Sequence, residues 1–257
     1  LHSLKIEKKY FKKALIMAAI FSVQYFLMFW GISKTTASRA VLLIYLQPFF
    51  VLLLSHLFIA GDRIFLRKFF GMIIGFCGLL PLFIFKDNIT AEFMTGDLLL
   101  LIAAFLWAAN AVYLKSFIHN TSVVTITFYH FLLSLPVFVT GAFILDTVMF
   151  RAFSAQAICA LLYQGLITGF GFIAWNFLIK KYQASLVHSF LFIAPLSGVL
   201  VSILLLSEPF TINLFGALIL IIIGIIIYII PKNRIGRLAR ICSDNIRYLS
   251  FIILRGN

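Results

Sequence analysis

The sequence predicts an all-α polytopic membrane protein with eight transmembrane helices in this chain. Hydrophobic residues make up 63% of its 257 positions, and the mean hydropathy is +1.11. Charged residues make up only 11%, about half the fraction found in soluble domains. The apolar residues also fall in continuous blocks of about 20, the length that a helix needs to cross the hydrocarbon core. An internal repeat then predicts how these helices are arranged.

Each apolar block ends at charged, polar or proline residues, which mark the loops between spans. The breaks are Lys34-Thr35-Thr36, Gly61-Asp62-Arg63, Lys86-Asp87-Asn88, His119-Asn120-Thr121, Arg151, Lys180-Lys181 and Pro209. The predicted spans are residues 14–33, 38–60, 68–85, 97–118, 122–145, 157–179, 185–206 and 212–230.

The Lys and Arg residues predict the orientation of these spans. If the N-terminus lies in the cytoplasm, all but four of the 21 basic residues fall on the cytoplasmic side. The exceptions are Lys34, Arg39, Lys86 and Arg151. Cytoplasmic loops carry such an excess of positive charge, so we expect both termini of this chain in the cytoplasm and the protein in the cell (inner) membrane. The bilayer, and not a nucleic acid, is therefore the partner that the net charge of +13 indicates.

The internal repeat relates two segments 147 residues apart. The stretch Ile32–Ser38 resembles Ile179–Ser185, and each copy is followed by a proline, an acid and a glycine at similar spacing. These are Pro48, Asp62 and Gly71 after the first copy, and Pro195, Glu208 and Gly216 after the second. Five helices separate the copies, so the two units have opposite orientation. Inverted repeats of this kind are typical of secondary transporters.

The repeat also predicts the domain organisation. Residues 1–95 form a first, N-terminally truncated repeat with three helices, and residues 96–230 form a second repeat with five. Residues 231–257 form a basic cytoplasmic tail. Two further helices are expected ahead of the first span, which would give a ten-helix fold of two five-helix units.

The segment that opens the second unit resembles a known family. Gly96-Asp97 is followed by a leucine-rich stretch and by Trp107-Ala-Ala-Asn110, which is similar to the signature of EamA-type permeases of the drug/metabolite transporter superfamily. The halves read Gly61-Asp62 and Ser207-Glu208 where that family usually has Gly-Glu. The resemblance implies a secondary transporter of small metabolites, such as amino acids or related polar solutes, that works by alternating access without a cofactor.

Polar and aromatic residues deep within the spans are the candidate substrate-binding residues. A polar side chain at this depth is costly unless it meets water, a solute or another helix. Trp107 and Asn110 lie three residues apart and can share a helix face. Hydrogen bonding between helices is the alternative role for such residues. The candidates are Gln24, Gln47, Trp107, Asn110, Tyr129, His130, Trp175 and Asn176.

The two prolines and the two acids of the repeat are candidates for conformational roles. Pro48 and Pro195 each remove a backbone donor, so we expect a helix kink and a pivot at each. Asp62 and Glu208 lie at helix ends, where each could cap a helix, remain solvated or form an ion pair that latches a gate. The spacing Gly71-x-x-x-Gly75 and Gly165-x-x-x-Gly169 predicts close helix packing.

Other function classes are poorly supported by the sequence. It contains no Walker A loop, no His-Glu-x-x-His, no Gly-x-Ser-x-Gly and no His/Cys cluster with metal-ligand spacing. We therefore expect neither an enzyme nor a metal site. A membrane scaffold or sensor without transport activity, or an inactive truncated copy, is the alternative to a transporter. The sequence does not indicate an oligomeric state.

Overall fold

The computed structural model describes residues 6–78, 80, 91–145, 154–194, 197 and 212–229. In these residues every regular element is helical, which confirms the predicted all-α class. The elements are α1 (Lys8–Ile32), α2 (Ala37–Ile44), α3 (Gln47–Phe58), α4 (Leu66–Cys77), α5 (Ala91–Phe117), η2 (Ile118–Asn120), α6 (Val123–Leu145), α7 (Ala155–Lys181), α8 (Ala184–Ser189), η3 (Phe190–Phe192) and α10 (Ile212–Ile229).

Within the described residues, five helical segments are long and apolar enough to cross a membrane. They are Lys8–Ile32, Arg39–Phe58, Met94–Asn120, Val123–Ile144 and Ala155–Lys181. Each corresponds to one predicted span. The predicted spans 68–85 and 185–206 are described only in part, by α4 and by α8 with η3, and α10 corresponds to 212–230. Pro195, Glu208 and the tail 231–257 lie outside the described residues. The division at residue 95 stays a prediction.

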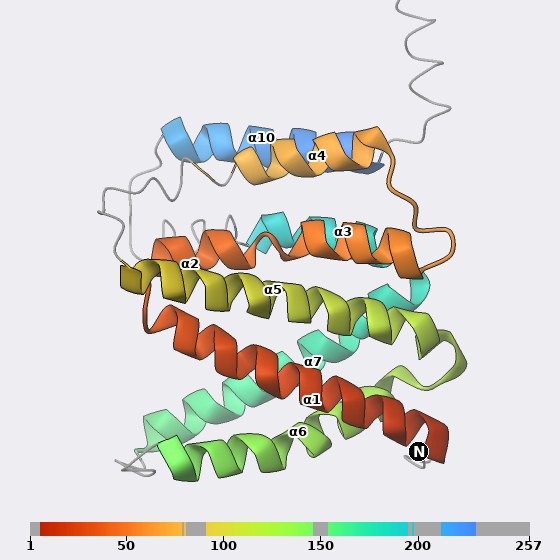
Figure 1. The fold of residues 1–257 in the computed structure, drawn as a ribbon, viewed down its shortest axis with the longest axis vertical. Coiled ribbons are helices and arrows are strands. Elements are labelled where there is room, and N and C mark those ends of the chain that lie inside the picture. Colours follow the sequence, from red (N-terminus) through yellow and green to blue (C-terminus); the bar gives the residue numbers. More distant parts are fainter. Residues whose placement is uncertain are drawn as a thin grey trace, which may run out of the picture.

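The helices are stacked side by side, as Figure 1 shows. α4 packs along α10 at one end of the stack, and α2 and α3 pack against α5. α1 crosses between α5 and α6, and α6 contacts α7. The centre of the protein is therefore enclosed by α1, α5, α6 and α7, with α8 closing it from the side of α3.

The second predicted span contains a break that hydropathy did not show. α2 ends at Ile44, a turn covers Tyr45 and Leu46, and α3 begins at Gln47. Pro48 lies in the first turn of α3, where a missing backbone N–H is tolerated. A proline ring clashes with the carbonyl four residues earlier, and that residue is Ile44, the last of α2. Pro48 therefore lies just after a helix break and not inside a continuous kinked helix.

Glycines set the closest approach between α4 and α10. A Cβ added to Gly224 would lie 2.5 Å from Gly71 O and 2.5 Å from Gly75 N. The predicted packing role of Gly71 and Gly75 is therefore confirmed. Gly165 and Gly169 differ, because no described atom lies within 4 Å of a Cβ placed at either.

A second close approach joins α1 to α5. A Cβ on Gly96 would lie 2.9 Å from Gly31 O. The next residue, Asp97, forms an ion pair with Arg39 and accepts a hydrogen bond from Thr35 Oγ1 at 3.0 Å. Gly96 thus allows the close contact with α1. Asp97 bonds to Thr35 and Arg39, in and next to the first copy of the repeat, Ile32–Ser38.

Candidate solute pocket

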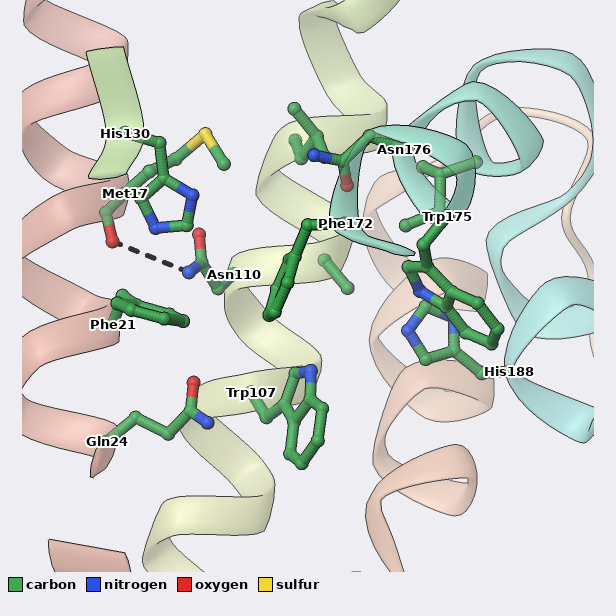
Figure 2. A pocket seen from close by; sticks show the side chains of 13 residues that line it. Met17, Phe21, Gln24, Trp107, Asn110, His130, Phe172, Trp175, Asn176 and His188 are labelled. Carbon is green, nitrogen blue, oxygen red and sulfur yellow. Dashed lines mark hydrogen bonds between the residues drawn. The ribbon is translucent and has the colours of Figure 1, made fainter. Parts of the chain in front are cut away.

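A small cavity lined by both polar and apolar side chains lies at the centre of the helix stack, as Figure 2 shows. Its volume is about 40 Å³. Six of the eight candidate binding residues line it together with His188 and six apolar residues. The lining consists of Met17, Phe21, Gln24, Trp107, Asn110, Ala111, Leu114, His130, Phe172, Trp175, Asn176, Ile179 and His188.

The buried stripe of α1 ends in the cavity. Tyr10, Ala14, Met17, Phe21 and Gln24 are all buried and recur every three or four residues, as one face of a helix requires. The first three pack in an apolar cluster with residues of α5 and α6. Gln24 continues the same face with an amide, and its buried Oε1 has no hydrogen-bond partner among the described residues. Gln24 Oε1, at the end of this apolar face, can therefore accept a hydrogen bond from a solute.

Asn110 and Trp107 reach the cavity from the facing side of α5, as their spacing predicted. Asn110 Nδ2 donates to the backbone oxygen of Met17 on α1 at 3.4 Å. Its Oδ1 is buried and has no partner in the described part of the chain. The side chain therefore both bonds across the helix pair and keeps an acceptor free.

Asn176 comes from α7 and is held by α6. Its Nδ2 donates to Thr127 Oγ1 at 2.9 Å, and the Thr127 hydroxyl donates to Val123 O at 2.8 Å. One residue earlier, Trp175 packs edge-on against His188, with 5.3 Å between ring centroids. These contacts fix the wall that α7 and α8 contribute.

Two imidazoles face the cavity from different helices. His130 on α6 packs edge-on against Phe21, with 4.7 Å between ring centroids, and neither ring nitrogen has a partner in the described residues. On α8, His188 Nδ1 lies 2.8 Å from Ala184 O, and its Nε2 has no described partner.

Several residues that line the cavity were not among the candidates, and two of the candidates, Gln47 and Tyr129, do not line it. Phe21 and Phe172 each lie three residues before a predicted candidate, Gln24 and Trp175, so helical spacing could have identified them. Gln47 is buried at the start of α3, and neither atom of its amide has a described partner. Tyr129 packs edge-on against Phe11 instead, with 6.1 Å between ring centroids.

Asp62 is buried in a second polar cluster away from the cavity. We call Asp62, Lys68, Gln183, Ser185 and Tyr228 the Asp62 cluster. Asp62 is 1% exposed and pairs with Lys68 at 2.8 Å, so it is not a solvated charge. Its Oδ2 also accepts from the backbone N–H of Ser185 at 3.0 Å, which caps the start of α8. Asp62 thus caps a helix and forms an ion pair, and a role of this pair as a gate latch stays a prediction.

The remaining members complete the hydrogen bonds of this cluster. Lys68 Nζ also donates to Gln183 Oε1 at 3.1 Å and to Ser185 Oγ at 3.3 Å. The Ser185 hydroxyl donates to Asp62 Oδ1 and accepts from Tyr228 OH at 2.7 Å. The cluster therefore ties α4, α8, α10 and the loop after α3 together at the second copy of the repeat.

Comparison with known proteins identifies the family. A profile of the EamA-like transporter family matches residues 2–84 and 94–230. The chain belongs to the EamA-like transporter family. Membership confirms the resemblance drawn from the Gly96–Asn110 segment. As an EamA-like protein, the chain is a multi-pass membrane transporter of a small-molecule solute, and it is not an enzyme.

Named relatives of this EamA-like chain come from bacteria and archaea. It is 29% identical over 227 residues to the uncharacterized transporter YoaV of Bacillus subtilis (strain 168), covering 86% of this chain and 77% of the relative. An uncharacterized transporter of Archaeoglobus fulgidus is 27% identical, with 84% and 76% covered. A "Probable amino-acid metabolite efflux pump" of Escherichia coli (strain K12) is 27% identical, with 74% and 67% covered.

A solved structure has the same fold. It is titled only as the crystal structure of a protein, superposes with a TM-score of 0.75 and is 18% identical, with 88% of this chain and 77% of that chain covered. At this identity the likeness concerns the fold alone.

Proposed function

We propose that this EamA-like protein is a secondary transporter of amino acids or related polar solutes, which bind in the central cavity and cross by alternating access. The observation that carries the proposal is the set of buried polar atoms that face one cavity and have no hydrogen-bond partner among the described residues. An unsatisfied buried acceptor costs about 1–3 kcal/mol. Several such atoms facing the same space are explained if a polar solute satisfies them during transport.

The position of the cavity supports this reading. It lies between α1 and α7, the two helices that the internal repeat relates. In transporters built from inverted repeats, the substrate site lies at the interface between the repeats near the bilayer midplane. The efflux pump of E. coli, named for amino-acid metabolites, supports the proposed substrate class.

The size of the cavity supports a conformational cycle. Ligand sites usually occupy about 300–1,000 Å³, whereas this cavity measures about 40 Å³. A solute therefore fits only after helices or side chains move apart. In our proposal the structure is an occluded conformation. The Asp62 cluster closes the cytoplasmic end of the cavity, and the Arg39–Asp97 ion pair keeps its outer end closed.

The proposal predicts that Gln24→Leu strongly lowers transport, whereas Gln164→Leu leaves it unchanged. Both changes replace a glutamine within a predicted span, but Gln24 lines the cavity whereas Gln164 is exposed and bonds Thr168 at 3.1 Å. Loss of one hydrogen bond to a solute should weaken its binding by about tenfold or more. Mass spectrometry of intracellular and external metabolites, at equal protein abundance, measures the result.

The same experiment separates the alternatives. Equal redistribution by all three proteins would contradict the assignment of the cavity as the binding site. No redistribution of any solute by the parent would favour a scaffold, a sensor or an inactive copy.

A further inference from the structure

We infer that the cavity selects solutes that carry an ammonium group, and that the hydrogen-bond acceptors it offers to such solutes are the amide oxygens of Asn110 and Asn176 and His188 Nε2. This inference rests on the proposed function, because it assigns a chemical class to the same site. It requires no acidic side chain. The argument depends on which atom of each side chain is directed into the cavity, and neighbouring groups settle that direction.

The orientation of Asn110 is set by a backbone carbonyl. Met17 O can only accept a hydrogen bond, so the amide atom 3.4 Å from it must be the NH₂ group. The carbonyl oxygen of Asn110 is then the other atom of the amide, which lies on the His130 side in Figure 2, and it is buried without a described partner. A neutral amide oxygen in this position accepts from any donor that enters the cavity.

The orientation of Asn176 follows from a chain of two hydrogen bonds. The Thr127 hydroxyl uses its hydrogen on Val123 O, so it can only accept from Asn176. The Asn176 NH₂ group must therefore face Thr127. Figure 2 shows the remaining oxygen directed toward the space between Phe172 and Trp175.

His188 adds a third acceptor. Ala184 O, 2.8 Å from His188 Nδ1, can only accept, so Nδ1 carries the hydrogen. In the neutral ring Nε2 is then an acceptor, and it is buried without a described partner. The orientation of three acceptors, on α5, α7 and α8, is thus set by hydrogen bonds to Met17, Thr127 and Ala184.

The rest of the lining also favours a cation over an anion. The thirteen residues include no Lys or Arg that could pair with a carboxylate. They include four large aromatic side chains, Phe21, Trp107, Phe172 and Trp175, and aromatic ring faces attract ammonium groups. The three acceptors and the aromatic walls together suit a primary amine that carries an apolar body.

Intrinsic fluorescence provides a direct binding test. The chain has three tryptophans, and Trp30→Phe would leave only Trp107 and Trp175, both in the cavity. We would titrate this purified protein with two matched series: phenethylamine, phenylalanine and 3-phenylpropionate, then isoamylamine, leucine and 4-methylpentanoate. The members of each series share one apolar body and differ in carrying the amine, both charged groups or the carboxylate alone.

We expect at least one amine to bind at least tenfold more tightly than the matching acid. Asn110→Leu should weaken amine binding by about tenfold to a hundredfold, because a hydrogen bond to a charged group is lost. Asn110→Asp, which keeps the acceptor, should retain amine binding, and Gln164→Leu should change nothing.

The inference is overturned if the acids bind as well as the amines, or if Asn110→Leu and Gln164→Leu give equal affinities. It is also overturned if no probe binds while the Gln24-dependent redistribution of metabolites persists, and the proposed function then stands. If that redistribution is absent as well, the proposed function itself fails.

Discussion

Lys68→Met is expected to lower the free energy of unfolding by about 3–5 kcal/mol, because it leaves the Asp62 carboxylate buried without its counter-ion. Lys68 is 4% exposed and donates to three acceptors of the Asp62 cluster. Methionine keeps an unbranched side chain as far as Cε but supplies no donor. Thermal unfolding of the purified protein in detergent measures the loss.

Two further variants test the cause of this loss. Arg63→Met removes a basic residue from the loop that carries Asp62, but Arg63 is exposed, so we expect a change within about 0.5 kcal/mol. Asp62→Asn combined with Lys68→Met removes both charges and should recover part of the stability. A double variant no more stable than Lys68→Met alone would contradict an ion-pair origin. If the Asp62 cluster also closes the cytoplasmic end of the cavity as proposed, the double variant should still fold. Its rates of uptake and export should then differ from those of the parent protein.

Gly224→Val is expected to force α4 and α10 apart and to cost about 1–3 kcal/mol or more. The new Cβ would lie 2.5 Å from backbone atoms of Gly71 and Gly75, and backbone atoms in a helix cannot move aside as a flexible side chain can. Thermal unfolding in detergent, compared with the parent protein, measures the effect.

Gly169→Val is the matched control for this prediction. It makes the same chemical change inside a helix, with the same change in helix propensity, but no described atom lies within 4 Å of the new Cβ. The difference between the two variants therefore reports the packing of α4 against α10. Equal losses of stability in both variants would show that the close approach at Gly224 does not matter.

Local features of the fold could be predicted because the bilayer imposes them. A helix in hydrocarbon must satisfy its backbone internally over about 20 residues, so hydropathy placed 122–145 within one residue of α6, Val123–Leu145. The turn at Tyr45 and Leu46 was missed because apolar residues continue through it. Pro48 indicated where the helix would be interrupted, but not whether the helix would bend or end there.

The lining of the cavity was predictable where one helix carries several of its residues. Trp107 and Asn110 meet in the cavity because their spacing places them on one face of α5. Gln47 was indistinguishable from Gln24 in sequence, since both are glutamines within apolar spans. The rotation of each helix decides which of them lines the cavity, and that rotation depends on packing between distant segments. The burial of Asp62 was hidden for the same reason, because Ser185 lies 123 residues away.

The sequence separations inside the Asp62 cluster bear on the order in which the protein can assemble. Lys68 follows Asp62 by six residues, whereas the partner Ser185 follows it by 123. During synthesis, the carboxylate can therefore find a counter-ion as soon as α4 emerges, long before α8 exists. An early local pair of this kind would keep the carboxylate from being buried without a counter-ion. The later arrival of α8 and α10 then adds hydrogen bonds to a site that is already neutral.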